Sequence, residues 1–299
     1  MITNTVSKYK NYLLLHFIVF IWGWSPILGK LINLEGVIAY QLVWFRMLIT
    51  VAVIFIYLKI SKQSLKIPRA DALKLIAIGA IIAFHWFSFY HAINVSNVSV
   101  TMVAFATGTL FISITEPFFY KRKIIVYEIF FGLVIIGAIA MIFKIETRYS
   151  LGIIFGILAA FTASFFSVFN GLLVKRILPS IITFYELGGG LLVWSVYLLL
   201  QGEFTPQFFN ITPKGYMWLS ILAIAGTAFP FVVSVNLLKK ISPYTITLAL
   251  NLETVYGIII AYFLWEKDEA MTPGFYIGTL IILSVVFGNG LLKMYLRKS

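Results

Sequence analysis

The 299-residue sequence has no cysteine and few charged residues. The missing cysteine leaves the redox compartment unreadable and, with only three scattered histidines, argues against a metal site or a metalloenzyme. Neither a phosphate-binding glycine loop nor a nucleophilic triad occurs, so we expect no cofactor and no enzymatic activity. Only 11% of the residues are Asp, Glu, Lys or Arg, whereas a soluble domain carries about 25%. This scarcity of charge excludes an ordinary soluble protein.

Long uncharged stretches dominate the sequence instead. Hydrophobic residues make up 61% of it, and the mean hydropathy is +0.98. A bilayer core needs roughly 20 apolar residues per helix, and continuous apolarity favours helices over barrel strands, which alternate in segments of about ten residues. We therefore expect an all-α integral membrane protein. Ten transmembrane helices are predicted, at residues 12–32, 36–58, 72–93, 98–120, 124–143, 151–174, 180–201, 215–238, 243–265 and 273–293.

The basic residues are distributed unevenly between the predicted loops. The net charge is +12, and if the N-terminus is cytoplasmic, most Lys and Arg residues flank the cytoplasmic helix ends, among them Lys8, Lys293, Arg297 and Lys298. The positive-inside rule then places both termini in the cytoplasm. We interpret the basic charge as a sign of bilayer topology and expect no nucleic-acid partner.

The chain consists of two similar halves. A shift of 146 residues places the fourth and fifth spans on the ninth and tenth without a gap, matching Ser96 with Ser242. A shift of 145 residues places Gln41 on Glu186. Each half has an odd number of spans, so the halves must insert in opposite orientations. Inverted repeats are a transporter architecture with a site near the bilayer midplane. We predict two inverted five-helix repeats, at residues 11–145 and 149–297.

Short motifs in four of the spans match a known family. They are Trp22-Gly23, Ser25-Pro26 and Lys30, then Arg46, then Gly152 to Arg176, and finally Leu252 to Gly257 followed by Trp265-Glu266-Lys267. Over residues 12–293 the chain resembles the EamA family of the drug/metabolite transporter (DMT) superfamily. The resemblance implies a ten-helix metabolite transporter, often an exporter of amino acids or related compounds. Family members differ widely in substrate, so the resemblance does not name one.

Three ionisable side chains lie at mid-membrane depth, where a charge costs at least ~2.5–3.5 kcal/mol. Glu253 is predicted to exchange a proton or to pair with a substrate ammonium, and its repeat counterpart is Thr107. The alternative is a protonated glutamate that bonds a neighbouring helix. Arg46 stays charged and needs an anion, which could be Glu253, a substrate carboxylate or a lipid head group. His85 and the adjacent Trp86 belong to two aromatic stripes that could face a cavity or simply pack.

Further polar and aromatic residues complete the predicted substrate site. Trp22 lies at mid-depth in the first span, Asn170 lies in the sixth, and Tyr256 follows the glutamate of span nine by one turn. Pro26 and Pro230 interrupt the first and eighth spans. They are predicted either to let these helices bend during transport or to serve packing alone.

Charged residues near helix ends are predicted to be structural. Lys30 is expected to anchor the end of the first span at the membrane surface. Glu116 and Glu186 lie near cytoplasmic helix ends beside basic loops, and solvated ion pairs are the expected explanation. The charged cluster at 266–269 is predicted to be a solvated exterior surface.

These features together predict a secondary transporter in a bacterial cytoplasmic membrane. It would move a small organic metabolite, with amino-acid export as the first hypothesis, by alternating access. Its partners would be this substrate, the lipid bilayer and, if transport is coupled, protons; the sequence does not decide between monomer and dimer. The alternatives are a nucleotide-sugar or phosphorylated-sugar exchanger, a lipid flippase, and a non-transporting sensor or adaptor. An intramembrane enzyme would need a polar catalytic cluster at one interface, which the sequence lacks.

Overall fold

The computed structural model describes residues 2–123 and 125–296, and over these residues the chain consists of helices and loops without strands. Several side chains near the two ends of the chain and at the start of the fifth span are not included in this description. The side chains of Lys8 and Lys293, and the residues Arg297 and Lys298, therefore lie outside the described part. The predicted end of the second repeat at 297 lies outside it as well.

Helices follow one another along both halves of the chain. The first half contains α1 (Ile2–Gly23), α2 (Ser25–Leu34), α3 (Ala39–Ile60), α4 (Arg69–Val95), α5 (Val98–Phe105), α6 (Gly108–Tyr120) and α7 (Val126–Ile145). The short helix η1 (Thr147–Tyr149) leads into the second half. That half contains α8 (Ser150–Leu173), α9 (Pro179–Leu200), α10 (Pro206–Phe209), α11 (Pro213–Ala223), η2 (Ile224–Ala228), α12 (Phe229–Leu237), α13 (Pro243–Leu264), α14 (Glu266–Glu269) and α15 (Pro273–Leu296).

Eight helical segments of the described chain are long and apolar enough to cross a membrane. They are Lys10–Leu34, Ala39–Ile60, Arg69–Val95, Val98–Tyr120, Thr147–Leu173, Pro179–Leu200, Pro213–Leu237 and Pro243–Glu269, and each overlaps a predicted span. Helices α7 and α15 occupy the two remaining predicted spans, with shorter apolar parts at Phe130–Ile145 and Pro273–Gly288. The all-α multi-pass membrane fold is therefore confirmed, whereas the count of ten crossings stays a prediction.

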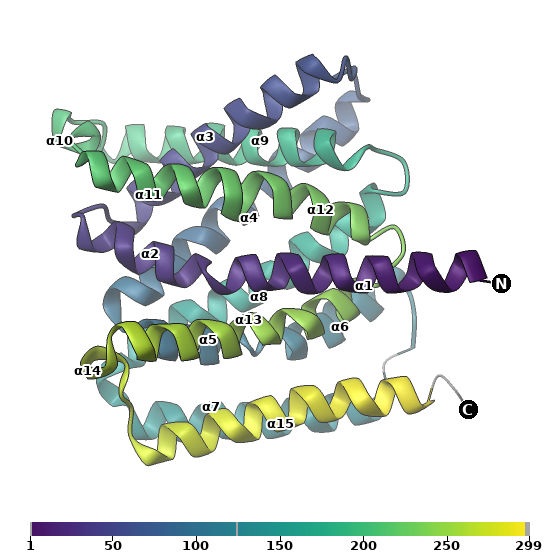
Figure 1. The fold of residues 1–299 in the computed structure, drawn as a ribbon, viewed down its shortest axis with the longest axis vertical. Helices are drawn as coiled ribbons and strands as arrows, with labels where there is room; N and C mark the ends of the chain where they lie inside the picture. Colours follow the sequence, from purple (N-terminus) through teal and green to yellow (C-terminus); the bar gives the residue numbers. More distant parts are fainter. Residues whose placement is uncertain (1, 124, 297–299) are drawn as a thin grey trace.

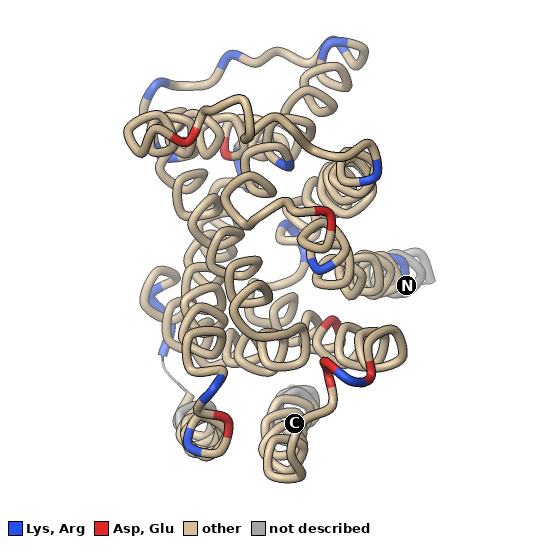
Figure 2. Tube along the Cα trace, turned by 90° about the vertical axis from the view of Figure 1, so that its left-hand side faces the viewer, with Lys and Arg blue, Asp and Glu red and all other residues tan. Residues whose placement is uncertain are grey.

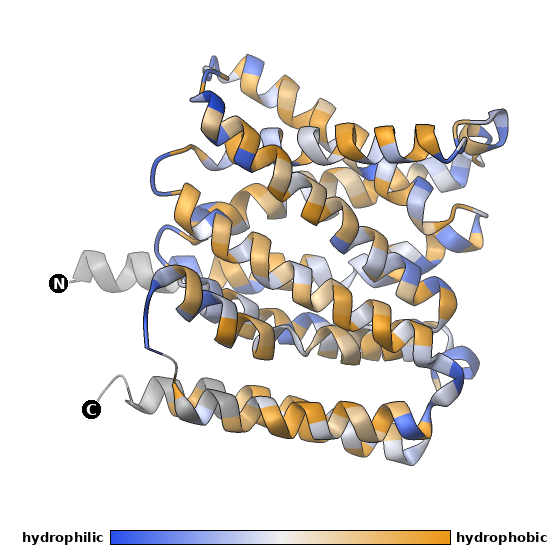
Figure 3. Ribbon diagram, turned by 180° about the vertical axis from the view of Figure 1, so that it is seen from behind, coloured by the Kyte–Doolittle hydropathy of each residue, from blue (hydrophilic) through white to orange (hydrophobic). Residues whose placement is uncertain are grey.

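The helices run side by side in one bundle. Helices α7 and α15 pack on each other, and Figures 1 and 2 place this pair along one side of the bundle. The start of α1 and the end of α15 lie at the same end of the bundle (Figure 1). Figure 3 shows hydrophobic residues along the helices and hydrophilic ones mainly in the loops and at the helix ends, as a bilayer requires.

Three of the crossing segments are interrupted. Helices α1 and α2 are separated at Trp24, just before Pro26, which lacks the N–H that a continuous helix would use. Helices α5 and α6 are separated at residues 106–107, where no proline predicts a break. In the segment Pro213–Leu237 the five-residue π-helix η2 directly precedes the turn that contains Pro230. The chain is thus interrupted near both Pro26 and Pro230, while their role in bending or in packing stays a prediction.

The centre of the bundle is the contact of α4 with α8 and α9, the most extensive pairings in the fold. At Gly79 of α4, a Cβ atom would overlap the carbonyl oxygen of Glu186 in α9. At Gly190 of α9, a Cβ atom would in turn overlap the backbone of Gly79. Glycine at both positions therefore permits the two helix backbones to touch. This close approach seals Glu186 inside the bundle.

Two predictions about acidic side chains are wrong. Glu186 is completely buried rather than solvated, and it receives a hydrogen bond from Asn170 at 3.3 Å. Glu269 of the cluster at 266–269 is 1% exposed, and it accepts hydrogen bonds from the backbone N–H groups of Val98 and Ser99. The reason is tertiary: α9 is covered by α4, and the segment that contains α14 folds against the start of α5.

Two further charged residues form pairs, although neither is a simple surface group. Glu116 forms the predicted kind of ion pair, with Arg122 at 3.3 Å, but its 5% exposure contradicts the predicted solvation. Lys30 binds the carboxylate of Glu269 at 2.9 Å and that of Asp268 at 3.5 Å. Lys30 therefore connects the first half of the chain to the second, which differs from a membrane anchor.

Candidate functional site

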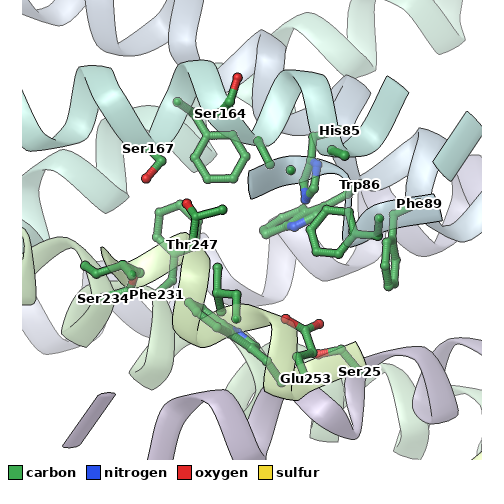
Figure 4. A pocket seen from close by; sticks show the side chains of 18 of the residues that line it. Ser25, His85, Trp86, Phe89, Ser164, Ser167, Phe231, Ser234, Thr247 and Glu253 are labelled. Carbon is green, nitrogen blue, oxygen red and sulfur yellow. The ribbon is translucent and has the colours of Figure 1, made fainter. Parts of the chain in front are cut away.

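A cavity lies inside the bundle between the two halves of the chain (Figure 4). Its lining comes from α1 to α6 of the first half and from α8, α12 and α13 of the second. The cavity has a volume of ≈ 120 Å³. Sites for small organic molecules typically measure about 300–1,000 Å³, so in this conformation the cavity is narrower than a typical ligand site. Both halves of the chain form its wall.

Most of the predicted site residues meet at this cavity. Six line it: Trp22, Arg46, His85, Trp86, Asn170 and Glu253. Thr107 and Tyr256 lie outside the lining. The Thr107 hydroxyl donates to the carbonyl of Ala104 at 2.7 Å, because it lies at the interruption between α5 and α6. The Tyr256 hydroxyl lies 3.1 Å from His16 Nε2 of α1.

Arg46 is held in the cavity wall by neutral partners. Its side chain is buried, its Nε donates to the Thr227 hydroxyl at 2.8 Å, and its Nη1 donates to the Tyr90 hydroxyl at 2.8 Å. The guanidinium carbon lies 3.8 Å from the centroid of the Trp86 ring, a cation–π contact. Among the described residues, no carboxylate oxygen lies within 4.0 Å of the Arg46 nitrogens. The charge is therefore held in position without being neutralised, and it remains available to an anionic group.

The π-helix η2 explains how the segment Pro213–Leu237 reaches Arg46. Pro230 has no N–H, so the carbonyl of Gly226, four residues earlier, lacks its usual helical donor. Trp22 Nε1, from the other half of the chain, donates to this carbonyl at 3.0 Å. In the same widened turn, the Thr227 hydroxyl accepts the hydrogen bond of Arg46 while donating to a carbonyl of its own segment. Pro230 shapes the site in this way without lining it.

Glu253 is the acidic group of the cavity. Figure 4 shows its carboxylate pointing into the space, on the side opposite His85. Among the described residues, Glu253 has no hydrogen-bond donor and no cationic nitrogen within 4.0 Å. The direct ion pair with Arg46, one of the predicted alternatives, is therefore not formed, although both side chains line one cavity. The free acceptor capacity of this carboxyl group faces the cavity.

The remaining wall is aromatic and hydroxylic. His85 Nδ1 lies 2.8 Å from the carbonyl oxygen of Ala159, which assigns the hydrogen to Nδ1 and leaves Nε2 as an acceptor in the neutral ring. The His85 ring centroid lies 5.1 Å from that of Phe166, in an edge-to-face arrangement. Ser25, Ser167, Ser234 and Thr247 contribute hydroxyl side chains to this wall (Figure 4), whereas the Ser164 hydroxyl donates to the carbonyl of Phe161 at 2.7 Å. Such a surface suits a substrate that has both an apolar and a polar part.

Sequence reasoning missed the two residues that position Arg46. Tyr90 lies one turn after Trp86 on an aromatic stripe of α4, and this spacing was an available signal. Thr227 carried no such signal, because a π-helix changes which side chains share a helix face.

Comparison with known proteins points to one family. The model of the EamA-like transporter family matches residues 10–144 and again residues 150–291. No curated protein matches the sequence. A solved structure described as "Crystal structure of protein" shares 13% sequence identity and has a TM-score of 0.68, and the match covers 93% of this chain and 97% of that one. At this identity the likeness concerns the fold alone.

Proposed function

This chain belongs to the EamA-like transporter family, and we propose on that basis that it is a secondary transporter of a small zwitterionic metabolite, with an amino acid as the simplest case. The two inverted repeats alternate the access of the cavity between the two sides of the membrane. Transport runs outward across a bacterial cytoplasmic membrane. The basic residues at the predicted cytoplasmic helix ends support an orientation of the chain in which both termini lie in the cytoplasm.

One observation carries the proposal: a single cavity contains one fixed cation and one acidic group that do not pair with each other. Arg46 uses two of its five N–H donors on Thr227 and Tyr90. The remaining donors match the geometry of a carboxylate. Glu253 offers its oxygens to an ammonium group. A zwitterion that spans the two groups compensates both charges of the protein and both of its own.

An exchanger of phosphorylated or nucleotide sugars fits this cavity less well. A phosphate group carries up to two negative charges, and proteins bind it with several Lys or Arg side chains. Among the described residues, Arg46 is the one Lys or Arg side chain in the cavity lining. The carboxyl group of Glu253 in the same space would repel a phosphate.

Counterflow in proteoliposomes tests the proposal, with purified full-length protein and four radiolabelled compounds. They are a neutral amino acid, its carboxamide, its N-acetyl derivative and a sugar phosphate. We expect flux of the free amino acid only, because each derivative lacks one of the two charges. Glu253→Gln should lower this flux about 100-fold. The matched control is Glu35→Gln, which makes the same change outside the membrane segments, where Glu35 pairs with Lys214 at 3.0 Å.

Each other outcome would contradict a defined part of the proposal. Equal flux of the amino acid and its carboxamide would remove Arg46 from substrate binding. Flux of the sugar phosphate would favour the exchanger. No flux of any compound by well-folded wild-type protein would favour the flippase or the adaptor.

A further inference from the structure

A completely buried acidic side chain lies next to the cavity rather than in it. Glu186 is completely buried in α9, at the level where Gly79 of α4 touches the α9 backbone. Its hydrogen-bond partner is Asn170 of α8, and Asn170 lines the cavity. The amide of Asn170 therefore stands between the cavity and a carboxyl group that has no direct access to it.

The hydrogen bonding of this pair is incomplete. Asn170 Nδ2 donates to Glu186 Oε2 at 3.3 Å, while the two remaining oxygens, Glu186 Oε1 and Asn170 Oδ1, are buried without a partner. Two buried acceptors cannot satisfy each other. One hydrogen placed on Oε1 changes this, because the resulting O–H can donate to Asn170 Oδ1 and close an acid–amide ring with two hydrogen bonds. The unpartnered atoms are thus accounted for by a single proton.

The surroundings provide no cation for an ionised Glu186. Helices α3, α4 and α12 pack against α9, and Asn170 belongs to α8. Helices α8 and α12 carry no Asp, Glu, Lys, Arg or His. The charged or imidazole side chains of α3 and α4 are Arg46, Lys59, Arg69, Asp71, Lys74, His85 and His91. Arg46 is bound by Thr227 and Tyr90, Asp71 is paired with Arg176 at 2.7 Å, and no cationic nitrogen of the described residues lies within 4.0 Å of Glu186.

At the corresponding position of the first repeat, both polar ends of the side chain are hydrogen-bonded. Gln41, which the repeat alignment places on Glu186, is also buried. Its Oε1 accepts from the N–H of Ile38 at 3.1 Å, and its Nε2 donates to the carbonyl of Phe208 at 3.1 Å. Both ends of the amide are thus used, and nothing remains to bind or release. Only the second repeat carries a titratable group at this position.

We propose that Glu186 and Asn170 form the proton-binding site that couples transport to the proton gradient, separate from the substrate groups Arg46 and Glu253. The proton sits on Glu186 Oε1 and is shared with Asn170 Oδ1. It is released to water in the cavity when Asn170 turns toward a polar group there, and it is taken up again from the opposite side after the repeats have changed access. This proposal rests on the proposed transport function and adds its coupling ion.

The transport test measures accumulation rather than rate. Proteoliposomes with a pH difference of one unit and with the membrane potential held at zero are loaded with the transported amino acid. Exchange of one proton per neutral zwitterion predicts accumulation of about tenfold on the acidic side, because one pH unit corresponds to a factor of ten. We expect Glu186→Gln to bring this ratio to about one while substrate still moves down its own gradient. The control Glu35→Gln should keep the tenfold ratio.

A second measurement does not need a substrate. The infrared carbonyl band of protonated carboxyl groups is recorded for the wild type, Glu186→Gln and Glu35→Gln in a pH titration. A band that titrates in the wild type and in Glu35→Gln, but is lost in Glu186→Gln, supports the proton site. Asn170→Ala should keep the band but shift its titration, because it removes the partner and not the proton carrier.

The two measurements distinguish failure of the proposed transport function from failure of the proposed proton site. Absence of flux in the wild type together with loss of the infrared band in Glu186→Gln overturns the transport function but not the proton site. Tenfold accumulation by Glu186→Gln overturns the proposal and assigns coupling to a group other than Glu186. An infrared band unchanged in folded Glu186→Gln overturns it as well.

Discussion

Buried acidic side chains occur in two regions of this molecule, at helix ends and inside helices, and their surroundings differ. Those at helix ends or in adjoining turns each have a cationic partner within 4.0 Å; they are Asp71, Glu116, Glu146 and Glu269. Glu186 and Glu253 lie inside α9 and α13, where one has a single hydrogen-bond donor and the other has none among the described residues. Carboxyl groups at the helix ends therefore have cationic partners, whereas those inside α9 and α13 have one hydrogen-bond donor or none among the described residues.

Glu269 is the acidic side chain of this group with the most partners in the described chain. It accepts from the backbone N–H groups of Val98 and Ser99 at 3.2 and 2.8 Å and from the Ser99 hydroxyl at 2.8 Å, while Lys30 lies 2.9 Å away. Free N–H groups at a helix start attract a negative charge, which Glu269 supplies to α5. The second repeat has a counterpart at the start of α13, where Glu116 accepts from the N–H of Tyr244 at 2.6 Å.

This difference indicates which acidic groups stabilise the fold and which are free to bind a substrate or a proton. A carboxylate whose oxygens already accept from backbone N–H groups and pair with a cation has little remaining capacity to bind a ligand, so it contributes to stability. A carboxyl group inside a helix cannot use the backbone N–H groups, because these are bonded within the helix. Its free capacity remains for substrate or protons.

The helix-end group should give the largest loss of stability. Glu269→Ala leaves Lys30 without its buried partner and two N–H groups without an acceptor, so the free energy of unfolding should fall by about 3–5 kcal/mol. Denaturant unfolding in detergent micelles, followed by tryptophan fluorescence, measures it. Asp268→Ala is the matched control, since Asp268 is 67% exposed and lies 3.5 Å from the same lysine. Equal effects of the two changes would contradict the division.

Inside a helix the opposite pattern is expected. Glu253→Gln should lower amino-acid flux about 100-fold, which corresponds to about 2.7 kcal/mol of lost stabilisation. Its unfolding midpoint should not fall, because the change removes a buried acidic group that has no partner among the described residues. Flux and unfolding are measured on the same preparation. A marked loss of stability with normal flux would make Glu253 a structural residue.

The positioning of Arg46 is tested through its partner. Thr227→Val removes the hydroxyl that accepts from Arg46 Nε and should reduce flux about tenfold, since a hydrogen bond to a charged group contributes about 1.5 kcal/mol or more. The effect should fall on the apparent substrate affinity more than on the maximal rate. Thr50→Val is the control, because its buried hydroxyl donates to the carbonyl of Ala223 and not to Arg46. Loss of flux in both variants would indicate a general packing effect.

The smallest effect is expected at the surface. Hydrogen bonds from Lys214 and Thr212 hold the pKa of Glu35 below its usual value. A lowered pKa in the folded state contributes stability above the unfolded-state pKa, and this contribution is lost as the pH falls through the folded-state pKa. Solvent screens this ion pair, so Glu35→Gln should leave the unfolding midpoint at pH 7 unchanged within error. Because the contribution can only become smaller toward acid pH, the two midpoints, measured from pH 7 down to about pH 3, should stay equal within error throughout.

The helices, their apolar character and the two repeats could be predicted from the sequence alone, and so could which polar residues lie in the middle of an apolar span. These properties can be counted along one chain, because hydropathy and distance from a helix end belong to single segments. Arg46 and Glu253 could be predicted on this ground, since any ionisable residue at mid-depth needs a reason to be there. Both do line the cavity.

The neighbours of each side chain, by contrast, depend on how the helices pack. A helix that is apolar on all sides carries no periodic pattern to mark its packed face, so nothing predicted that α4 covers Glu186. Glu269 binds a helix start 170 residues earlier in the chain. Pro230 marks an interruption in its span, but it does not predict that a π-helix there brings Thr227 to Arg46. Such contacts depend on the packing of many helices at once, and for that reason they cannot be found by counting along any one of them.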